Sequence, residues 1–228
     1  MELFQVSKCL DVEHTIAKYM FDPVENPWEV LPSISIFIEQ LGPMLPSEEF
    51  EQRGSNVWIS KSAVIAPTAY IGGPCIIDAG TEVRHCAFIR GSAIIGKNCV
   101  IGNSTELKNV IIFDNVQVPH YNYVGDSILG FKSHMGAGSI TSNVKSDKTL
   151  VHVKGMDPET NEKFDLETGL KKFGAMLGNH VEVGCNSVLN PGTVIGSNSN
   201  VYPLSPVRGF VPAESIYKTG GVIVKKHA

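Results

Sequence analysis

Large apolar residues recur at every sixth position over two stretches of this chain, and this period limits the possible folds more than any other feature. A period of six fits neither an α-helix nor a two-sided strand, whose apolar residues repeat at about 3.6 and 2 residues. It fits short flat strands joined by tight turns. The first stretch consists of Ile59, Ile65, Ile71, Ile77, Val83, Ile89, Ile95, Ile101, Leu107 and Phe113, and the second of Leu177, Val183, Leu189, Ile195, Val201 and Val207.

The residues between these positions are of the kinds that tight turns require. A small residue stands four positions after each of the first eight aliphatics, and Gly72, Gly96 and Gly102 directly follow three of them. Three such strands make one triangular coil of about 18 residues, with the aliphatics stacked inside and successive coils paired about 4.8 Å apart. The sequence therefore predicts an all-β protein, a parallel β-helix. A β-sandwich with coincidental spacing is the alternative that this period disfavours.

The ends of the chain lack the period. Asp11 and the pair Asn26-Pro27 are typical of helix starts, so we expect residues 1–56 to form two short helices that cap the first coil, followed by a linker. The β-helix is expected over residues 57–210, and a C-terminal tail over 211–228.

The period also breaks twice inside the β-helix. Phe113 and Leu129 are 16 residues apart rather than 12 or 18, so we expect residues 114–128 to bulge. Between about 142 and 176 two alternating stretches, LVHVK and KFDLE, flank the turn-prone MDPETNE, which predicts a protruding hairpin arm. Both segments are candidates for function, because loops on a rigid scaffold often carry it.

Composition excludes several classes of protein. A net charge of −4, from 19 basic and 23 acidic residues, gives no basic field for nucleic acid. No apolar run approaches the ~18 residues of a membrane span, and the N-terminus does not resemble a secretory signal. We therefore expect no nucleic-acid or membrane partner. The cysteines are odd in number and form no C-x-x-C pair, so we expect reduced, buried thiols in a cytoplasmic protein and no zinc site: Cys9, Cys75, Cys86, Cys99 and Cys185.

Two basic residues are placed where an anion could bind. Arg90 and Lys108 are 18 residues apart, so they should stack at one corner on adjacent coils. Two like charges in that position repel each other mildly, and a phosphate between them would relieve the repulsion. Two solvated cations that splay apart remain the alternative.

His120 is the candidate general base. It lies in the expected bulge, about one coil beyond Lys108, and an imidazole titrates near physiological pH. A histidine in a loop without a catalytic role is the alternative. Tyr121 and Tyr123 could line a sugar pocket or pack against the coil.

These residues resemble a known family. The six-residue period is similar to that of the hexapeptide-repeat proteins, whose members form left-handed parallel β-helices and mostly trimers. Within it, E-L-K-N, H-x-x-Y-x-G-D and G-A-G-x-I-T-x-N follow one another between residues 106 and 143. They resemble the acetyltransferase domain of the bifunctional N-acetylglucosamine-1-phosphate uridylyltransferase/glucosamine-1-phosphate acetyltransferases. The likeness covers about 57–143 and resumes loosely at 177–207.

The resemblance implies roles residue by residue. Arg90 and Lys108 match the basic residues that hold the sugar phosphate, His120 matches the general base, and Tyr123 matches a sugar-binding tyrosine. On the acetyl-CoA side, it implies roles for the backbone around Gly136-Ala137-Gly138, for Asn143 and, with the alignment off by one position, for Lys148. His134 stands where the family has a sugar-binding asparagine, and Val144 replaces an aromatic residue. The implied active site forms between subunits of a homotrimer.

The expected function is acyl-CoA-dependent N-acetylation of an amino-sugar phosphate or a nucleotide-linked amino sugar, with acetyl-CoA as co-substrate and no metal. Nucleotidyl transfer is not expected, because residues 1–56 are too short for a uridylyltransferase domain and contain no G-x-G-T-R loop. A non-catalytic β-helix that binds sugar phosphates or nucleotide sugars is the main alternative. A metal-dependent hexapeptide protein of the carbonic anhydrase type would need converging histidines, from among His120, His134, His152 and His180.

Overall fold

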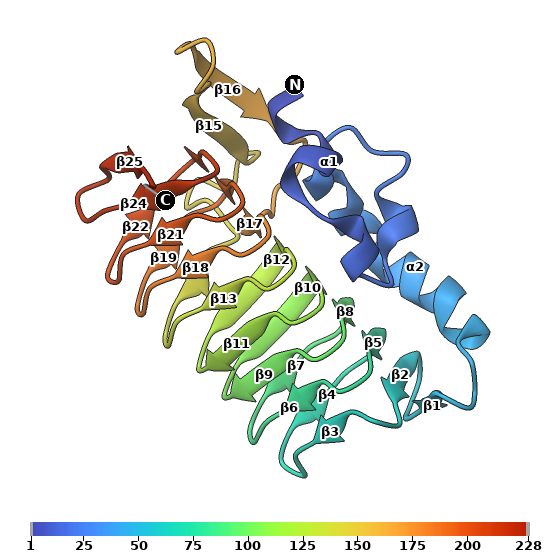
Figure 1. Ribbon diagram of the computed structural model, residues 1–228. Coiled ribbons are helices and arrows are strands. Elements are labelled where there is room, and N and C mark those ends of the chain that lie inside the picture. Colours follow the sequence, from blue (N-terminus) through green and yellow to red (C-terminus); the bar gives the residue numbers. More distant parts are fainter. Residues whose placement is uncertain (1, 227–228) are drawn as a thin grey trace.

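The chain forms a left-handed parallel β-helix with a helical segment along one side and a hairpin arm (Figure 1). The structure is a computed structural model that describes residues 2–226. Strands of successive coils pair in parallel, as the six-residue period predicts, and each coil has three faces. The predicted fold class is confirmed.

The first face, called here the covered face, is buried on both sides. Its outward positions carry Ile76, Ile94, Ile111, Ile128 and Met176, all fully buried. Its strands are β2 (Val57–Ser60), β5 (Cys75–Ile77), β8 (Ala93–Ile95), the second halves of β10 (Glu106–Ile112) and β12 (Tyr123–Leu129), β17 (Ala175–Leu177), β20 (Thr193–Ile195) and β23 (Phe210–Val211).

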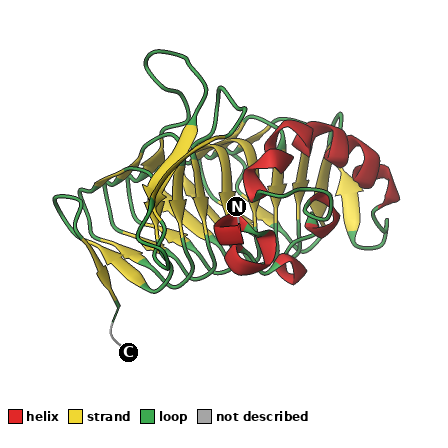
Figure 2. Cartoon of the chain, turned by 90° about the horizontal axis from the view of Figure 1, so that it is seen from above, coloured by secondary structure: helices red, strands yellow, loops and turns green. Residues whose placement is uncertain are grey.

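The N-terminal segment is the cover of this face. Helix α2 contacts β5, β8 and β10, and the 3-10 helix η4 contacts β12. Figure 2 shows these helices lying alongside a row of strands. The helical elements are η1 (Glu2–Phe4), α1 (Val6–Cys9), η2 (Val12–His14), η3 (Lys18–Met20), η4 (Pro27–Ser33), α2 (Ile34–Leu41) and η5 (Gly42–Met44).

The expectation that these helices cap the first coil was wrong. The outward aliphatics of the covered face require a cover along many coils, and each buried side chain is worth about 1.5–3 kcal/mol. Strand β1 (Phe50–Gln52) instead pairs antiparallel with β2 and covers the free edge of the first coil. The starts at Asp11 and Asn26-Pro27 do begin helical turns, η2 and η4.

Most of the predicted site residues lie on the two other faces and at their corners. The second face contains β3 (Val64–Ile65), β6 (Glu82–Val83), β9 (Val100–Asn103), β11 (Gln117–His120), β13 (His134–Met135), β18 (Glu182–Val183), β21 (Asn200–Val201) and β24 (Ser215–Tyr217). The third, called here the site face, contains β4 (Tyr70–Ile71), β7 (Phe88–Ile89), the first residues of β10 and β12, β14 (Ile140–Thr141), β19 (Val188–Leu189) and β22 (Pro206–Val207).

The segment expected to bulge stays within the coils. Lys108 pairs with Gly125 and Val110 pairs with Ala93, each 17 residues away rather than 18. Two coils thus lose one residue each, which explains the shortened spacing. The expected inward position of Phe113 was therefore wrong by one residue. Ile112 stacks on Ile95, and Phe113 packs against Phe21 beneath the N-terminal segment.

The C-terminal region continues the coil beyond residue 210. Strand β24 pairs in parallel with β21, and β25 (Ile223–Lys225) then folds back antiparallel on β24. The arm is the predicted hairpin, formed by β15 (His152–Met156) and β16 (Lys163–Glu167). None of the helices within residues 2–226 is long and apolar enough to cross a membrane.

Candidate functional site

One corner of the β-helix carries the two predicted phosphate-binding cations on successive coils. Ile89 pairs with Leu107, so that Arg90 and Lys108, which follow them, lie on adjacent rungs. The same register continues through the later coils. This corner, called here the Arg90 corner, consists of Arg90, Lys108, Gly125, Ser142, Asn190 and Arg208.

Each of these two cations has a carboxylate partner. Arg90 Nη1 lies 2.9 Å from Glu106 Oε1, and this contact raises the pKa of the Arg90 guanidinium above its ordinary value. Lys108 Nζ lies 3.1 Å from Asp126 Oδ2. The two side chains are therefore not bare cations, because each is held by an ion pair with a different carboxylate.

Asp126 is the centre of a buried polar cluster beneath this corner. Its side chain is nearly inaccessible, and it accepts hydrogen bonds from Lys108 Nζ, from Asn109 Nδ2 at 3.0 Å and from Asn143 Nδ2. Asn109 and Asp126 both have positive φ, at 54° and 47°, a conformation that asparagine and aspartate adopt more readily than most residues. The cluster thus connects the predicted phosphate-binding residue Lys108 with Asn143, predicted for the acetyl-CoA side.

Tyr123 lies on the site face beside this cluster. It pairs in register with Glu106 on one coil and Ile140 on the next. Burial, reinforced by the nearby carboxylates of Asp126 and Glu106, raises the pKa of the Tyr123 phenol. The hydroxyl is therefore a stable proton donor at neutral pH, suited to hydrogen bonding with a ligand.

His120 lies at the other corner of the site face. It ends β11, its side chain is exposed, and Ala137 occupies the same corner on the next coil because Gln117 pairs with His134. Buried Asn122 holds this corner by donating to the carbonyl oxygens of Gly136 at 2.8 Å and Ser139 at 3.1 Å. This corner is called here the His120 corner.

The two corners bound a narrow face. Residues 123–125 span it, which at about 3.3 Å per residue gives a width of about 10 Å. His120 is thus not beside the cations, as a bulge would have placed it, but across the face from them. Lysine, arginine and tyrosine side chains at the Arg90 corner are long enough to extend over part of this width.

Two predicted site residues lie elsewhere. His134 is on the second face, where its Nδ1 lies 2.9 Å from Glu182 Oε2. Lys148 lies in an exposed turn before the arm. Within one chain the structure therefore brings together Arg90, Lys108, Tyr123 and Asn143 at one corner, and His120 with Ala137 at the other.

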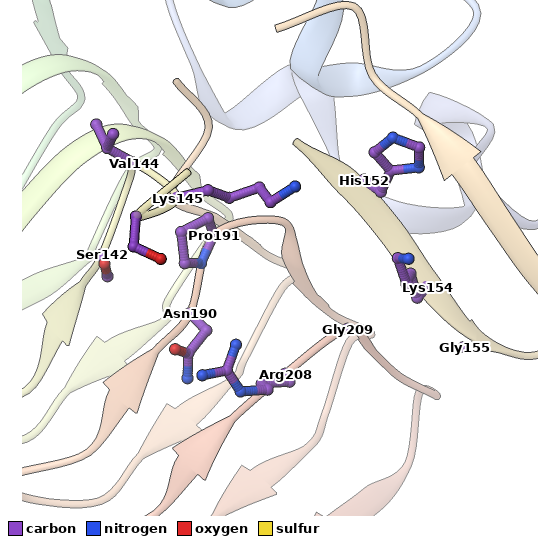
Figure 3. A pocket seen from close by; sticks show the side chains of 11 residues that line it. Ser142, Val144, Lys145, His152, Lys154, Gly155, Asn190, Pro191, Arg208 and Gly209 are labelled. Atoms are coloured by element: carbon purple, nitrogen blue, oxygen red, sulfur yellow. The ribbon is translucent and has the colours of Figure 1, made fainter. Parts of the chain in front are cut away.

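A basic cleft, called here the arm cleft, opens where the Arg90 corner meets the arm (Figure 3). It has a volume of about 600 Å³, within the range of small-molecule sites. Lys145 extends toward the arm, and Arg208 lies beside Asn190. Its walls are formed by Ser142, Val144, Lys145, Ser146, His152, Lys154, Gly155, Asn190, Pro191, Arg208 and Gly209.

Two glycines let the arm pack closely on the coils. Gly192 and Gly209 have positive φ, and a Cβ on either would collide with the carbonyl oxygen of His152 or Lys154 respectively. On the open face of the arm, His152 Nδ1 lies 2.5 Å from Asp165 Oδ1 and Lys154 Nζ lies 2.7 Å from Asp165 Oδ2. The sequence predicts the arm but not the cleft. The pairs Pro191-Gly192 and Arg208-Gly209 are a signal for it, because a glycine at a corner permits another segment to approach closely.

The cysteines and histidines form no further centre within residues 2–226. No three metal-ligating side chains come together there. Cys9, Cys75 and Cys99 are buried, and burial raises their pKa values to about 11, 12 and 12. The expectation of uniformly buried thiols was wrong for Cys86 and Cys185, which are exposed at the His120 corner.

The sequence is similar to those of known proteins. The profile of the family described as "GMPPB C-terminal domain" matches residues 71–195. A relative named bifunctional protein GlmU, from Methanococcus maripaludis strain C5, is 33% identical over 231 residues, which cover 99% of this chain and 53% of that protein. Another of that name, from Methanocaldococcus jannaschii, is 31% identical over 78% of this chain and 42% of its own length.

The chain therefore spans about half the length of the curated relatives it matches. Among solved structures, a hexapeptide transferase family protein from Anaplasma phagocytophilum matches with a TM-score of 0.42 and 15% identity, over 75% of this chain and 81% of that one.

Proposed function

Because this chain belongs to the GMPPB C-terminal domain family and resembles one half of the GlmU proteins, we propose that it is an acyl-CoA-dependent N-acetyltransferase. Its acceptor is an amino sugar that carries a phosphate or a nucleotide. The observation that carries the proposal is the site face itself. A basic residue pair and a tyrosine lie at one edge of this face, and the exposed His120 lies at the other edge, where the face is about 10 Å wide.

The acceptor binds through its phosphate at the Arg90 corner. Arg90 and Lys108 supply charge-assisted hydrogen bonds, and Tyr123 supplies a neutral donor. The ion pairs with Glu106 and Asp126 hold the two cations in place, and each cation retains further N–H donors for a ligand.

The transfer is a direct attack on the thioester. His120 Nε2 or Nδ1 takes the proton from the sugar amine, and the amine nitrogen forms a bond to the thioester carbonyl carbon. The C–S bond then breaks, and the CoA thiolate leaves. The backbone N–H of Ala137 stabilises the oxyanion, since Ala137 lies on the rung next to His120 and the N–H groups of Gly136 and Gly138 donate to backbone carbonyls of the coil.

We also propose that the protein acts as a homotrimer. His134 lies on the second face and cannot join Tyr123 within one chain, so its predicted sugar contact requires a neighbouring subunit. The His134–Glu182 pair would then belong to the acceptor site of the adjoining chain.

The test is the release of free CoA thiol from acetyl-CoA with glucosamine 1-phosphate, with UDP-glucosamine and with unphosphorylated glucosamine. Turnover with either of the first two and little with the third supports the proposal. Saturable binding of the first two without thiol release would support a non-catalytic sugar-phosphate binding protein instead. Val144, which stands where the family has an aromatic residue on the acetyl-CoA side, is the observation that favours this second candidate.

A further inference from the structure

The arm cleft is lined by basic side chains that have no role in the proposed acceptor site. Among its eleven lining residues are Lys145, Lys154 and Arg208, and none of the eleven is an aspartate or glutamate. A hollow with three cations in its walls attracts an anion, and arginine is suited to bidentate phosphate binding.

Arg208 is the cation best placed to accept a ligand. Within residues 2–226 it forms no ion pair, whereas Lys145 lies 3.4 Å from Asp147 and Lys154 lies 2.7 Å from Asp165. Its guanidinium lies beside the side chain of Asn190 (Figure 3), which adds a neutral hydrogen-bonding group. The carboxylate partners of both lysines lie outside the cleft walls.

The cleft is continuous with the proposed acyl-transfer site. Ser142, Asn190 and Arg208 occupy successive rungs of the Arg90 corner, and Asn143 directly follows Ser142. At about 4.8 Å per rung, Arg208 lies about 10 Å beyond the rung of Ser142. A ligand with its phosphates in the cleft and a chain that crosses the site face, about 10 Å wide, toward Ala137 would connect the cleft with the His120 corner.

We infer that the arm cleft binds the phosphates of the adenosine 3′-phosphate 5′-diphosphate end of acyl-CoA, and that the arm supplies Lys154 to this site. Arg208 and Lys145 contact the ligand from the coil side. This inference rests on the proposed function for the choice of acyl-CoA. The nucleotide of a nucleotide-linked acceptor sugar shares the same phosphate chemistry, and the experiment separates the two.

The experiment measures binding by calorimetry with adenosine 3′,5′-bisphosphate and, separately, with UDP. We expect the bisphosphate to bind the wild-type protein, and to bind Arg208→Gln and Lys154→Gln each about tenfold more weakly. Lys163→Gln is the matched control, because Lys163 lies on the same arm outside the cleft walls, and its affinity should not change. Unchanged affinity in Arg208→Gln, or binding of UDP alone in an Arg208-dependent manner, would overturn the inference.

A second measurement separates this inference from the proposed function. The KM for acetyl-CoA should rise in Arg208→Gln, and the KM for its 3′-dephospho analogue should change less, while kcat stays near the wild-type value. If the bisphosphate binds in an Arg208-dependent manner but no acyl transfer occurs, the ligand site in the arm cleft is supported and the acyltransferase function is contradicted. If acyl transfer occurs and the KM for acetyl-CoA is unchanged in Arg208→Gln, the acyltransferase function is supported and the ligand site in the arm cleft is contradicted.

Discussion

Lys108 Nζ lies 3.1 Å from the carboxylate of Asp126, on the next coil of the β-helix. The contact places a nearly inaccessible carboxylate directly beneath the cation predicted to hold a phosphate. Asp126 also accepts a hydrogen bond from Asn143, so one buried residue fixes groups proposed for both substrates. The position of the proposed site is thus set by a buried carboxylate.

Replacement of Asp126 by asparagine should reduce both stability and substrate affinity. Lys108 would lose its counter-charge, and hydrogen bonds to charged groups are worth about 1.5–3 kcal/mol. Denaturant unfolding should show a loss of about 2 kcal/mol. Glu106→Gln, which breaks the more exposed Arg90 pair, is the control and should lose less than about 1 kcal/mol. Equal losses in the two variants would show that burial of Asp126 is unimportant.

Neutralising Lys108 should weaken acceptor binding selectively. In Lys108→Gln the KM for the amino-sugar phosphate should rise about tenfold, because a charge-assisted phosphate contact is lost, while the KM for acetyl-CoA changes little. Lys108→Arg keeps the charge and should recover part of the affinity. Steady-state kinetics with each substrate varied in turn provide the check. An equal rise in both KM values would indicate general disturbance rather than a phosphate contact.

Truncation of Ile94 should destabilise the protein although its side chain points away from the coil interior. It lies on the outside of the covered face beneath the N-terminal segment and is fully buried. Ile94→Ala should lose about 2–5 kcal/mol in denaturant unfolding. Val64→Ala, at a position 64% exposed on the second face, should change stability by less than about 0.5 kcal/mol. Similar small effects at both positions would contradict the covering role of the N-terminal segment.

The pH dependence of stability should reveal the buried carboxyl of Asp78. Burial, with a smaller contribution from Asp114, raises its pKa above the ordinary value. Its ionised form therefore lowers stability at neutral pH, and this effect disappears as the pH falls below the ordinary pKa of about 4. Asp78→Asn should raise Tm at pH 7, with the gain shrinking toward pH 4.

Asp147→Asn should show the opposite sign. The Thr149 backbone N–H lowers the pKa of the Asp147 carboxyl, so its contribution is present at neutral pH and is lost as the pH falls. Melting curves of the wild type and both variants between pH 4 and 8 provide the comparison. A Tm gain for Asp78→Asn that is independent of pH would rule out this titration.

The inward face of the β-helix could be predicted from the sequence because its physical cause is local. Residues such as Ile89 and Leu107 repeat every six positions, and each coil pairs only with its neighbours. The hairpin arm was predictable for the same reason, since its two strands alternate on either side of one turn. The stacking of Arg90 on Lys108 followed from the same period.

The covering of one face could not be predicted, because it depends on contacts between distant segments. The apolar triplets that contain Ile76, Ile94 and Ile111 are the signal, since a strand with water on one side would not carry them. The coils at Asn109 and Asp126 are each one residue shorter than the 18-residue coils before them. The sequence did not predict this, because an irregular spacing between aliphatics is the same whether the coil has lost residues or contains a bulge. Arg208 and Lys154, 54 positions apart in the sequence, line the same arm cleft, and the six-residue period alone does not predict that they do.

Single-turnover acetyl transfer tests most directly whether the site face is a catalytic surface with His120 as its base. Wild-type protein and His120→Ala would be compared at saturating acetyl-CoA and amino-sugar phosphate, after equal unfolding curves have shown that the exposed substitution leaves the fold intact. We expect a rate about 10²–10⁴ times lower in His120→Ala, with acceptor affinity nearly unchanged, because the general base is lost. Equal rates in the two proteins would contradict it.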